Sequence, residues 1–256
     1  MFDNICKFLA ENFSSDFASW LLGEPITFTE LSPSELSLEP IRADALILLQ
    51  SDEVVLHLEF QTQPKAEIPF RMADYRLRVY RRFPQKRMSQ AVIYLQQTSS
   101  ELVQQDTFIL ERTRHEFDIF RLWEQPTNVF LQYQGLLPFA VLSNTSDRAE
   151  TLRQVAQEIS KISDQRTQSN VAASAFILAG LVLEKNIVKQ LLREELMQES
   201  VTYQAIKDEG RTEGIRRVAI NLLREGMSVE MVARVTGLTV EQVQQLEISA
   251  GENQGE

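Results

Sequence analysis

The segment VVLHLEFQTQ, residues 54–63, alternates apolar and polar side chains in the pattern of a β-strand. Because successive side chains of a strand point to opposite faces, four polar residues project together: His57, Glu59, Gln61 and Gln63. The apolar face suits a core, so the polar face is either a functional site or a solvent-facing surface. The chain has only two histidines and no His/Cys cluster, so His57 is more typical of a hydrogen-bonded strand residue than of a metal ligand.

A second carboxylate precedes this strand in the sequence. Residues 43–50, ADALILLQ, form an apolar run that Asp44 interrupts, and a two-residue turn at Ser51-Asp52 is expected to join the two strands. That turn places Asp44 directly opposite Glu59. Opposed carboxylates repel each other, and Mg²⁺, which prefers hard oxygen ligands, relieves the repulsion. The pattern therefore fits a magnesium site, and it fits equally a solvent-facing pair on an antiparallel sheet.

A strongly basic segment, IPFRMADYRLRVYRRF at residues 68–83, follows closely and is expected to be helical. Side chains three and four positions apart share one face of a helix. The members of this face are Arg71, Tyr75, Arg78 and Arg82. In a chain of net charge -10, such a concentration of positive charge suits a phosphate backbone. A solvated helix face is the alternative.

The elements around these residues predict an α/β (α+β) fold, a mixed sheet flanked by helices and followed by an all-helical C-terminal region. The expected order is a helix over 3–22, a weak strand within 25–40, strands at 43–50 and 54–63, a helix over 67–83 and a strand at 90–97. Residues 116–124 are expected to add a strand. Strand signals vanish from residue 147 onward, where helices are expected over 147–163, 168–205 and 206–225.

The segment SVEMVARVTGLTVEQVQQLE, residues 228–247, is typical of a helix-turn-helix, with Ser228 and Thr239 as caps and Gly237 at the break. The second helix carries Glu and Gln without Arg or Lys, which favours packing or oligomerisation over reading a DNA groove. A homo-oligomer through the C-terminal helices is therefore expected. Three regions follow from these patterns, with bounds 1–145, 146–205 and 206–256.

Composition and the N-terminus indicate a cytoplasmic protein. The single cysteine, Cys6, cannot form an intramolecular disulfide, and MFDNICKFLAEN lacks the pattern of a signal peptide. The longest apolar stretch, residues 171–183, is shorter than the roughly 18–20 residues that cross a bilayer. We therefore expect a buried helix there and no membrane partner.

The spacing of Asp44, Glu59-Phe60-Gln61, Arg71 and Tyr75 resembles the PD-(D/E)xK nuclease superfamily, and within it the bacterial recombination-promoting nuclease and putative transposase (Rpn-like) group. The resemblance covers roughly residues 1–145 and extends to the segments FRLWEQP and EGRTEGIRRVAINLLREGMS. It implies a restriction-endonuclease-like core and a metal-dependent DNA endonuclease that acts in recombination or transposition.

The resemblance also implies roles for individual residues. Asp44 and Glu59 would hold Mg²⁺, with Mn²⁺ as a substitute, and Gln61 would stand where the superfamily usually has Lys. An amide orients water or phosphate by hydrogen bonds but cannot take a proton, so activation of water would depend on the metal. The basic face would contact DNA or support the site. The candidates for an additional acid from the first helix are Glu11 and Asp16.

Two other functions remain open from the sequence. The missing Lys and the acidic net charge fit a catalytically weak or inactive nuclease fold that serves as a DNA-binding or protein-interaction module. The C-terminal helix pair also fits a transcription regulator.

Overall fold

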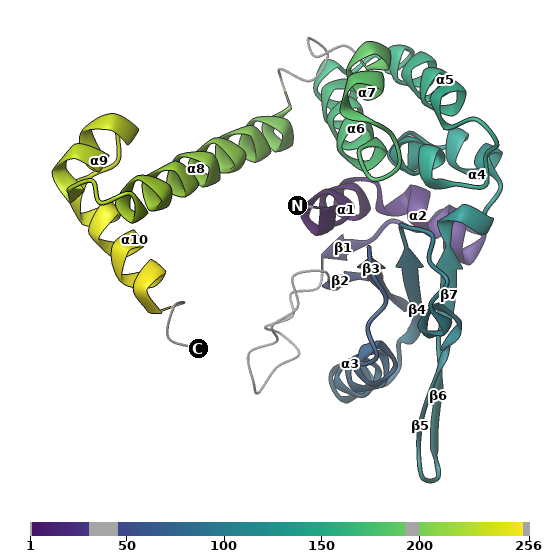
Figure 1. Ribbon diagram of the computed structural model, residues 1–256. Helices are drawn as coiled ribbons and strands as arrows, with labels where there is room; N and C mark the ends of the chain where they lie inside the picture. The colour runs from purple at the N-terminus through teal and green to yellow at the C-terminus, as the bar shows by residue number, and fades with distance from the viewer. Residues whose placement is uncertain (1, 31–45, 193–199, 253–256) are drawn as a thin grey trace. The chain divides into compact units, whose positions relative to one another are not determined.

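The computed structural model describes residues 2–30, 46–192 and 200–252 (Figure 1). The chain forms two compact units, residues 1–200 and 201–256. All described strands belong to the first unit, and the second unit is helical. The predicted fold class is therefore confirmed.

Five strands form the main sheet in the order β1-β2-β3-β4-β7. Their bounds are β1 Thr29–Glu30, β2 Leu46–Gln50, β3 Val54–Gln61, β4 Arg87–Tyr94 and β7 Asp118–Arg121. β1, β2 and β3 pair antiparallel, whereas β3, β4 and β7 pair in parallel, so the sheet is mixed. The strand expected within residues 116–124 is β7. β3 is buried along its whole length on both faces.

The hairpin between β2 and β3 turns one position later than predicted, at Asp52 and Glu53. Ser51 belongs to the ladder, because its N–H donates to the carbonyl oxygen of Val54 at 2.8 Å. The Ser51 hydroxyl also accepts from the N–H of Val54 at 3.1 Å. These bonds close the end of the ladder and fix the register.

The shift changes the residue that faces Glu59 across the hairpin. Leu46 is the partner of Glu59, so the predicted direct pairing of Asp44 with Glu59 is wrong. Asp44 itself lies outside the described residues. Its role as a metal ligand stays a prediction.

One face of the sheet is covered by α3, Ile68–Arg82 (Figure 1). Tyr75 and Val79 of this helix pack with Leu48 and Val55 of the sheet in one buried cluster. The residues of β3 that share a face with Val55 are His57, Glu59 and Gln61. The basic helix therefore lies directly over the polar residues of β3.

Helices α1, Phe2–Asn12, and α2, Ser14–Leu22, lie on the opposite face together with the 3-10 helix η4, Gln134–Leu142. Phe17 of α2 meets Phe60 of β3 edge to face, with ring centroids 6.2 Å apart. Phe60 also stacks on Phe139 of η4 at 5.8 Å. This aromatic cluster fixes α2 and η4 to the apolar face of β3.

The single helix predicted over residues 3–22 is broken at Phe13, whose backbone is not helical (φ -125°, ψ 37°). The Phe13 side chain packs against the backbone of Gly135 in η4. Asp16, one turn later, accepts a hydrogen bond from the Gly135 N–H at 2.8 Å. Contact with η4 therefore overrides the continuous helical pattern.

Gly135→Ala is expected to lower the free energy of unfolding by about 1–3 kcal/mol, toward the upper end of the usual cost of overpacking. An added Cβ would overlap Cβ and Cγ of Phe13 and would lie 3.0 Å from Oδ2 of Asp16. Urea denaturation measures the effect. Gly214→Ala is the control, because an added Cβ there has open space; equal stability of the two variants would contradict this packing.

The rest of the first unit consists of further helices and one extra hairpin. Their bounds are η2 Glu101–Gln104, β5 Thr107–Leu110, β6 Thr113–Glu116, η3 Leu122–Glu124, α4 Thr127–Leu131, α5 Arg148–Ser160, α6 Gln165–Ala179 and α7 Lys185–Leu191. β5 and β6 form a separate two-stranded sheet that the sequence analysis did not predict. The single helix predicted over 168–205 is wrong, because α6 ends at Ala179 and a turn separates it from α7.

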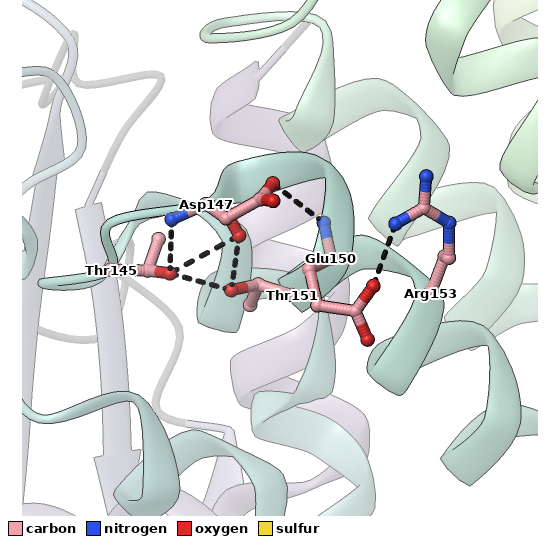
Figure 2. A network of polar contacts seen from close by, with 5 residues as sticks. All are labelled: Thr145, Asp147, Glu150, Thr151 and Arg153. Atoms are coloured by element: carbon pink, nitrogen blue, oxygen red, sulfur yellow. Dashed lines mark hydrogen bonds and ion pairs between the residues drawn. The ribbon is translucent and has the colours of Figure 1, made fainter.

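Helix α5 begins in a network of polar contacts (Figure 2). Asp147 accepts from the N–H of Glu150 at 2.9 Å and so caps the helix. The hydroxyls of Thr145 and Thr151 lie 2.7 Å apart, and they lie 3.2 Å and 2.9 Å from the carbonyl oxygen of Asp147. Glu150 pairs with Arg153 at 2.6 Å. These bonds explain why the helix starts at the position that the sequence predicts.

The second unit contains α8 Val201–Arg224, α9 Val229–Thr236 and α10 Val240–Glu252. Its small core consists of Ala219, Val232, Ala233 and Val243. Ser228 caps α9, and Gly237 ends it with a φ of 74°. Thr239 and Gln242 exchange hydrogen bonds at the start of α10. The predicted helix-turn-helix caps are confirmed.

Within the described parts of the chain, no helix is long and apolar enough to cross a bilayer.

Candidate active site

A row of polar side chains lies buried between α3 and the sheet. Its members are His57, Glu59 and Gln61 of β3 and Gln90 of β4, which is the parallel partner of His57. His57 and Glu59 have no exposed surface at all (0% each). A solvent-facing strand surface is therefore excluded for Glu59. Burying a carboxylate in this way is costly unless charged or hydrogen-bonding partners compensate it.

Glu59 has two such partners. Gln61 donates from Nε2 to Oε1 of Glu59 at 2.8 Å. A terminal guanidinium nitrogen of Arg71, from α3, lies 3.0 Å from Oε1 and 3.3 Å from Oε2. The Arg71 side chain is 21% exposed. The carboxylate is thus buried, whereas its cationic partner still reaches solvent.

Gln90 fixes the tautomer of His57. The amide Nε2 of Gln90 donates to the carbonyl oxygen of Met72 at 2.8 Å and lies 2.9 Å from Nδ1 of His57. Since the amide has two hydrogens, both contacts are donated, Nδ1 accepts, and Nε2 of His57 carries the proton. That Nε2 is buried without a hydrogen-bond partner among the described residues and lies 3.9 Å from Oε2 of Glu59.

The predicted basic face of α3 runs from the buried site to the surface. Tyr75 is buried against the His57 ring, with centroids 5.1 Å apart, and burial raises the pKa of its hydroxyl. This position favours a supporting role for Tyr75 over contact with DNA. Arg78 is held by Asp74 at 2.9 Å, and Arg82 is exposed.

The two acids proposed from the first helix lie elsewhere. Glu11 of α1 pairs with Lys7 at 3.4 Å, and Asp16 of α2 is held by the Gly135 N–H. Burial raises the pKa of both carboxyl groups. Their helices pack on the face of the sheet opposite α3, so the structure does not bring either acid together with Glu59.

The described residues contain no group of three or more His, Cys, Asp or Glu side chains that would hold a metal ion. Glu59 supplies a hard oxygen donor, and Gln61 adds an amide. The second predicted carboxylate, Asp44, lies outside the described residues. The donor chemistry present fits an ion such as Mg²⁺, which needs only one or two protein carboxylates.

Gln90 is the member of the row that the sequence analysis missed. It begins the run QAVIYLQQ, where it looks like a boundary residue of a buried strand. Only the parallel register of β3 and β4 places it beside His57. A polar residue at the start of an apolar strand is a weak signal, because many strands begin in this way.

Comparison with known protein families gives a match in the C-terminal part of the chain. Residues 212–247 match the model of the Rpn/YhgA-like nuclease family, C-terminal HTH domain. These residues comprise the end of α8, all of α9 and the first part of α10. Neither a curated protein nor a solved structure matches the chain significantly. The C-terminal part of this chain is thus similar to the helix-turn-helix domain of an Rpn-type nuclease family.

Proposed function

We propose that this chain is a metal-dependent DNA endonuclease of the PD-(D/E)xK type that acts in recombination or transposition. The observation that carries the proposal is the fully buried Glu59, which lies in a row of polar side chains beneath an arginine-rich helix. Active sites are the usual places where a fold buries a charged group at such cost. The C-terminal match to a nuclease family supports the same class of function.

Each residue of the proposed site has its own role. Asp44 and Glu59 would hold Mg²⁺, for which Mn²⁺ would substitute. When bound, such an ion lowers the pKa of water and offsets negative charge on the scissile phosphate. Gln61 orients Glu59 through its hydrogen bond and offers its own amide oxygen to the site. Arg71, which is partly exposed, would donate to a phosphate oxygen.

DNA is the proposed partner of both units. Arg78 and Arg82 extend the positive charge of α3 from Arg71 toward the surface. The helix-turn-helix match supports DNA association of the second unit, although its α10 offers no Arg or Lys among Glu241, Gln242, Gln244 and Gln245. Homo-oligomerisation through the C-terminal helices and a cytoplasmic location stay predictions.

The alternative is a nuclease fold that binds DNA or protein without cutting. One observation favours it: Arg71 already neutralises Glu59, and the usual Lys is replaced by Gln61. A bound metal would have to compete with this guanidinium for the carboxylate.

A nicking assay on supercoiled plasmid distinguishes the two functions. We expect the full-length chain to nick the plasmid in Mg²⁺ or Mn²⁺ and to lose this activity in EDTA. A gel-shift assay in EDTA measures binding separately. Binding without cleavage in either metal would favour the binding module, and the absence of both would contradict a DNA-associated role.

A further inference from the structure

A polar cavity of about 620 Å³ lies beside α3, between the start of β4 and the base of the β5–β6 hairpin. Its volume is in the range of small-molecule sites. Arg76 of α3, Gln90 of β4 and His115 of β6 line it. The sequence alone does not indicate a site here. Gln90 belongs to both the cavity and the buried polar row, so the cavity adjoins His57.

The cavity contains one cationic donor that lacks an anionic partner. Arg76 forms no ion pair with any carboxylate among the described residues, and its charge acts on His115. Burial and then the charge of Arg76 lower the pKa of His115. Nε2 of His115 is shielded from solvent and has no hydrogen-bond partner in the described structure. An anionic group of a ligand would complete the donors of Arg76.

The cavity also presents hydrogen-bond acceptors. Both amide hydrogens of Gln90 are used, so Gln90 offers only Oε1. Asp106 accepts from Thr107 through Oδ1, which leaves Oδ2, and the exposed Asp118 shows no side-chain partner among the described residues. The ligand should therefore carry N–H donors as well as an anion.

A nucleotide meets both requirements. Its phosphate suits Arg76, and the exocyclic amino group of cytosine, adenine or guanine donates to carboxylate and amide oxygens. Inorganic phosphate would pair with Arg76, but it has no amino group to donate to the carboxylates of the cavity. A simple cation would be repelled by Arg76.

We propose that this cavity binds a single nucleotide whose base carries an amino group, with Arg76 on the phosphate and Asp106, Asp118 and Gln90 facing the base. The source of the nucleotide rests on the proposed function: it would belong to DNA that the nuclease binds beside the polar row. Enzymes that act on nucleic acids accommodate unstacked nucleotides in pockets of this kind.

Calorimetry with 5′-mononucleotides in EDTA tests the proposal without cleavage. We expect deoxycytidine monophosphate to bind more tightly than thymidine monophosphate, because thymine has a carbonyl oxygen where cytosine has its amino group. Arg76→Gln should weaken binding of both by about tenfold or more, the effect of losing a hydrogen bond to a charged group. Asp118→Asn, at an exposed position, should reduce the preference for cytosine.

A single-stranded oligonucleotide containing cytosine should compete for the same site if DNA is the source of the nucleotide. Without competition, the cavity takes free nucleotides only, and DNA as the source is wrong.

Arg81→Gln is the matched control, since Arg81 is an exposed arginine of α3 that does not line the cavity. It should bind nucleotides as the unchanged chain does. The proposal is overturned if no mononucleotide binds, if inorganic phosphate binds as tightly as the nucleotides, or if Arg81→Gln loses as much affinity as Arg76→Gln. These readouts need no cleavage, so failure of the nuclease assay leaves them interpretable. Melting temperatures establish that each variant is folded.

Discussion

Glu59→Gln is expected to reduce DNA nicking by at least about a hundredfold while the protein stays folded. Replacing a partner in the outer shell of a metal site already costs about 10–100-fold, so removal of a ligand charge should cost more. Glutamine keeps the shape of Glu59 and one oxygen to accept from Arg71. The Arg71 guanidinium, which still reaches solvent, can be hydrated when the carboxylate is lost.

The initial rate of plasmid nicking in Mg²⁺ measures this effect, and the melting temperature tests folding. Glu53→Gln is the matched control, because Glu53 is an exposed carboxylate in the turn of the same hairpin. It should nick at the rate of the unchanged chain. Full activity of Glu59→Gln, in a protein that nicks DNA at all, would show that the buried row is structural.

Arg71→Met is expected to lower the free energy of unfolding by about 3 kcal/mol, the lower end of the cost of removing one partner of a buried ion pair. The physical reason is that Glu59 has no exposed surface and would keep only the bond from Gln61. We expect a loss of stability at the lower end of that range because Arg71 is itself partly exposed. Urea denaturation measures the change.

Arg78→Met provides the comparison, because Arg78 pairs with Asp74 where both side chains are partly exposed. Such pairs contribute about 0–1 kcal/mol. The double variant Glu59→Gln, Arg71→Met should recover part of the lost stability, since no buried charge is left unpaired. If Arg71→Met costs no more than Arg78→Met, the ion pair with Glu59 does not stabilise this fold.

The strand pattern of VVLHLEFQTQ was sufficient to predict β3 and the shared face of His57, Glu59 and Gln61. The same pattern did not show that this face is buried. A strand with polar residues on one face is usually solvated. Here α3 covers the face because its own apolar stripe, including Met72, needs the same surface.

Two features depended on contacts that sequence spacing does not contain. The predicted register of the hairpin was wrong because the backbone of Ser51 pairs with that of Val54. This pairing moves the turn by one position and makes Leu46 the partner of Glu59. The break at Phe13 arises from packing against Gly135, far along the chain. Helix caps were predicted better, because Ser228 and Thr239 accept hydrogen bonds from residues only three positions later.

In the proposed function, Asp44 and Glu59 together bind a divalent metal ion. Electron paramagnetic resonance of a Mn²⁺ titration of the full-length chain tests it directly. We expect that the chain binds Mn²⁺ and that Mg²⁺ displaces it. Asp44→Asn and Glu59→Gln should each abolish this binding, whereas Glu53→Gln should not. Binding that survives in both Asp44→Asn and Glu59→Gln, or no binding by the unchanged chain, would contradict the claim.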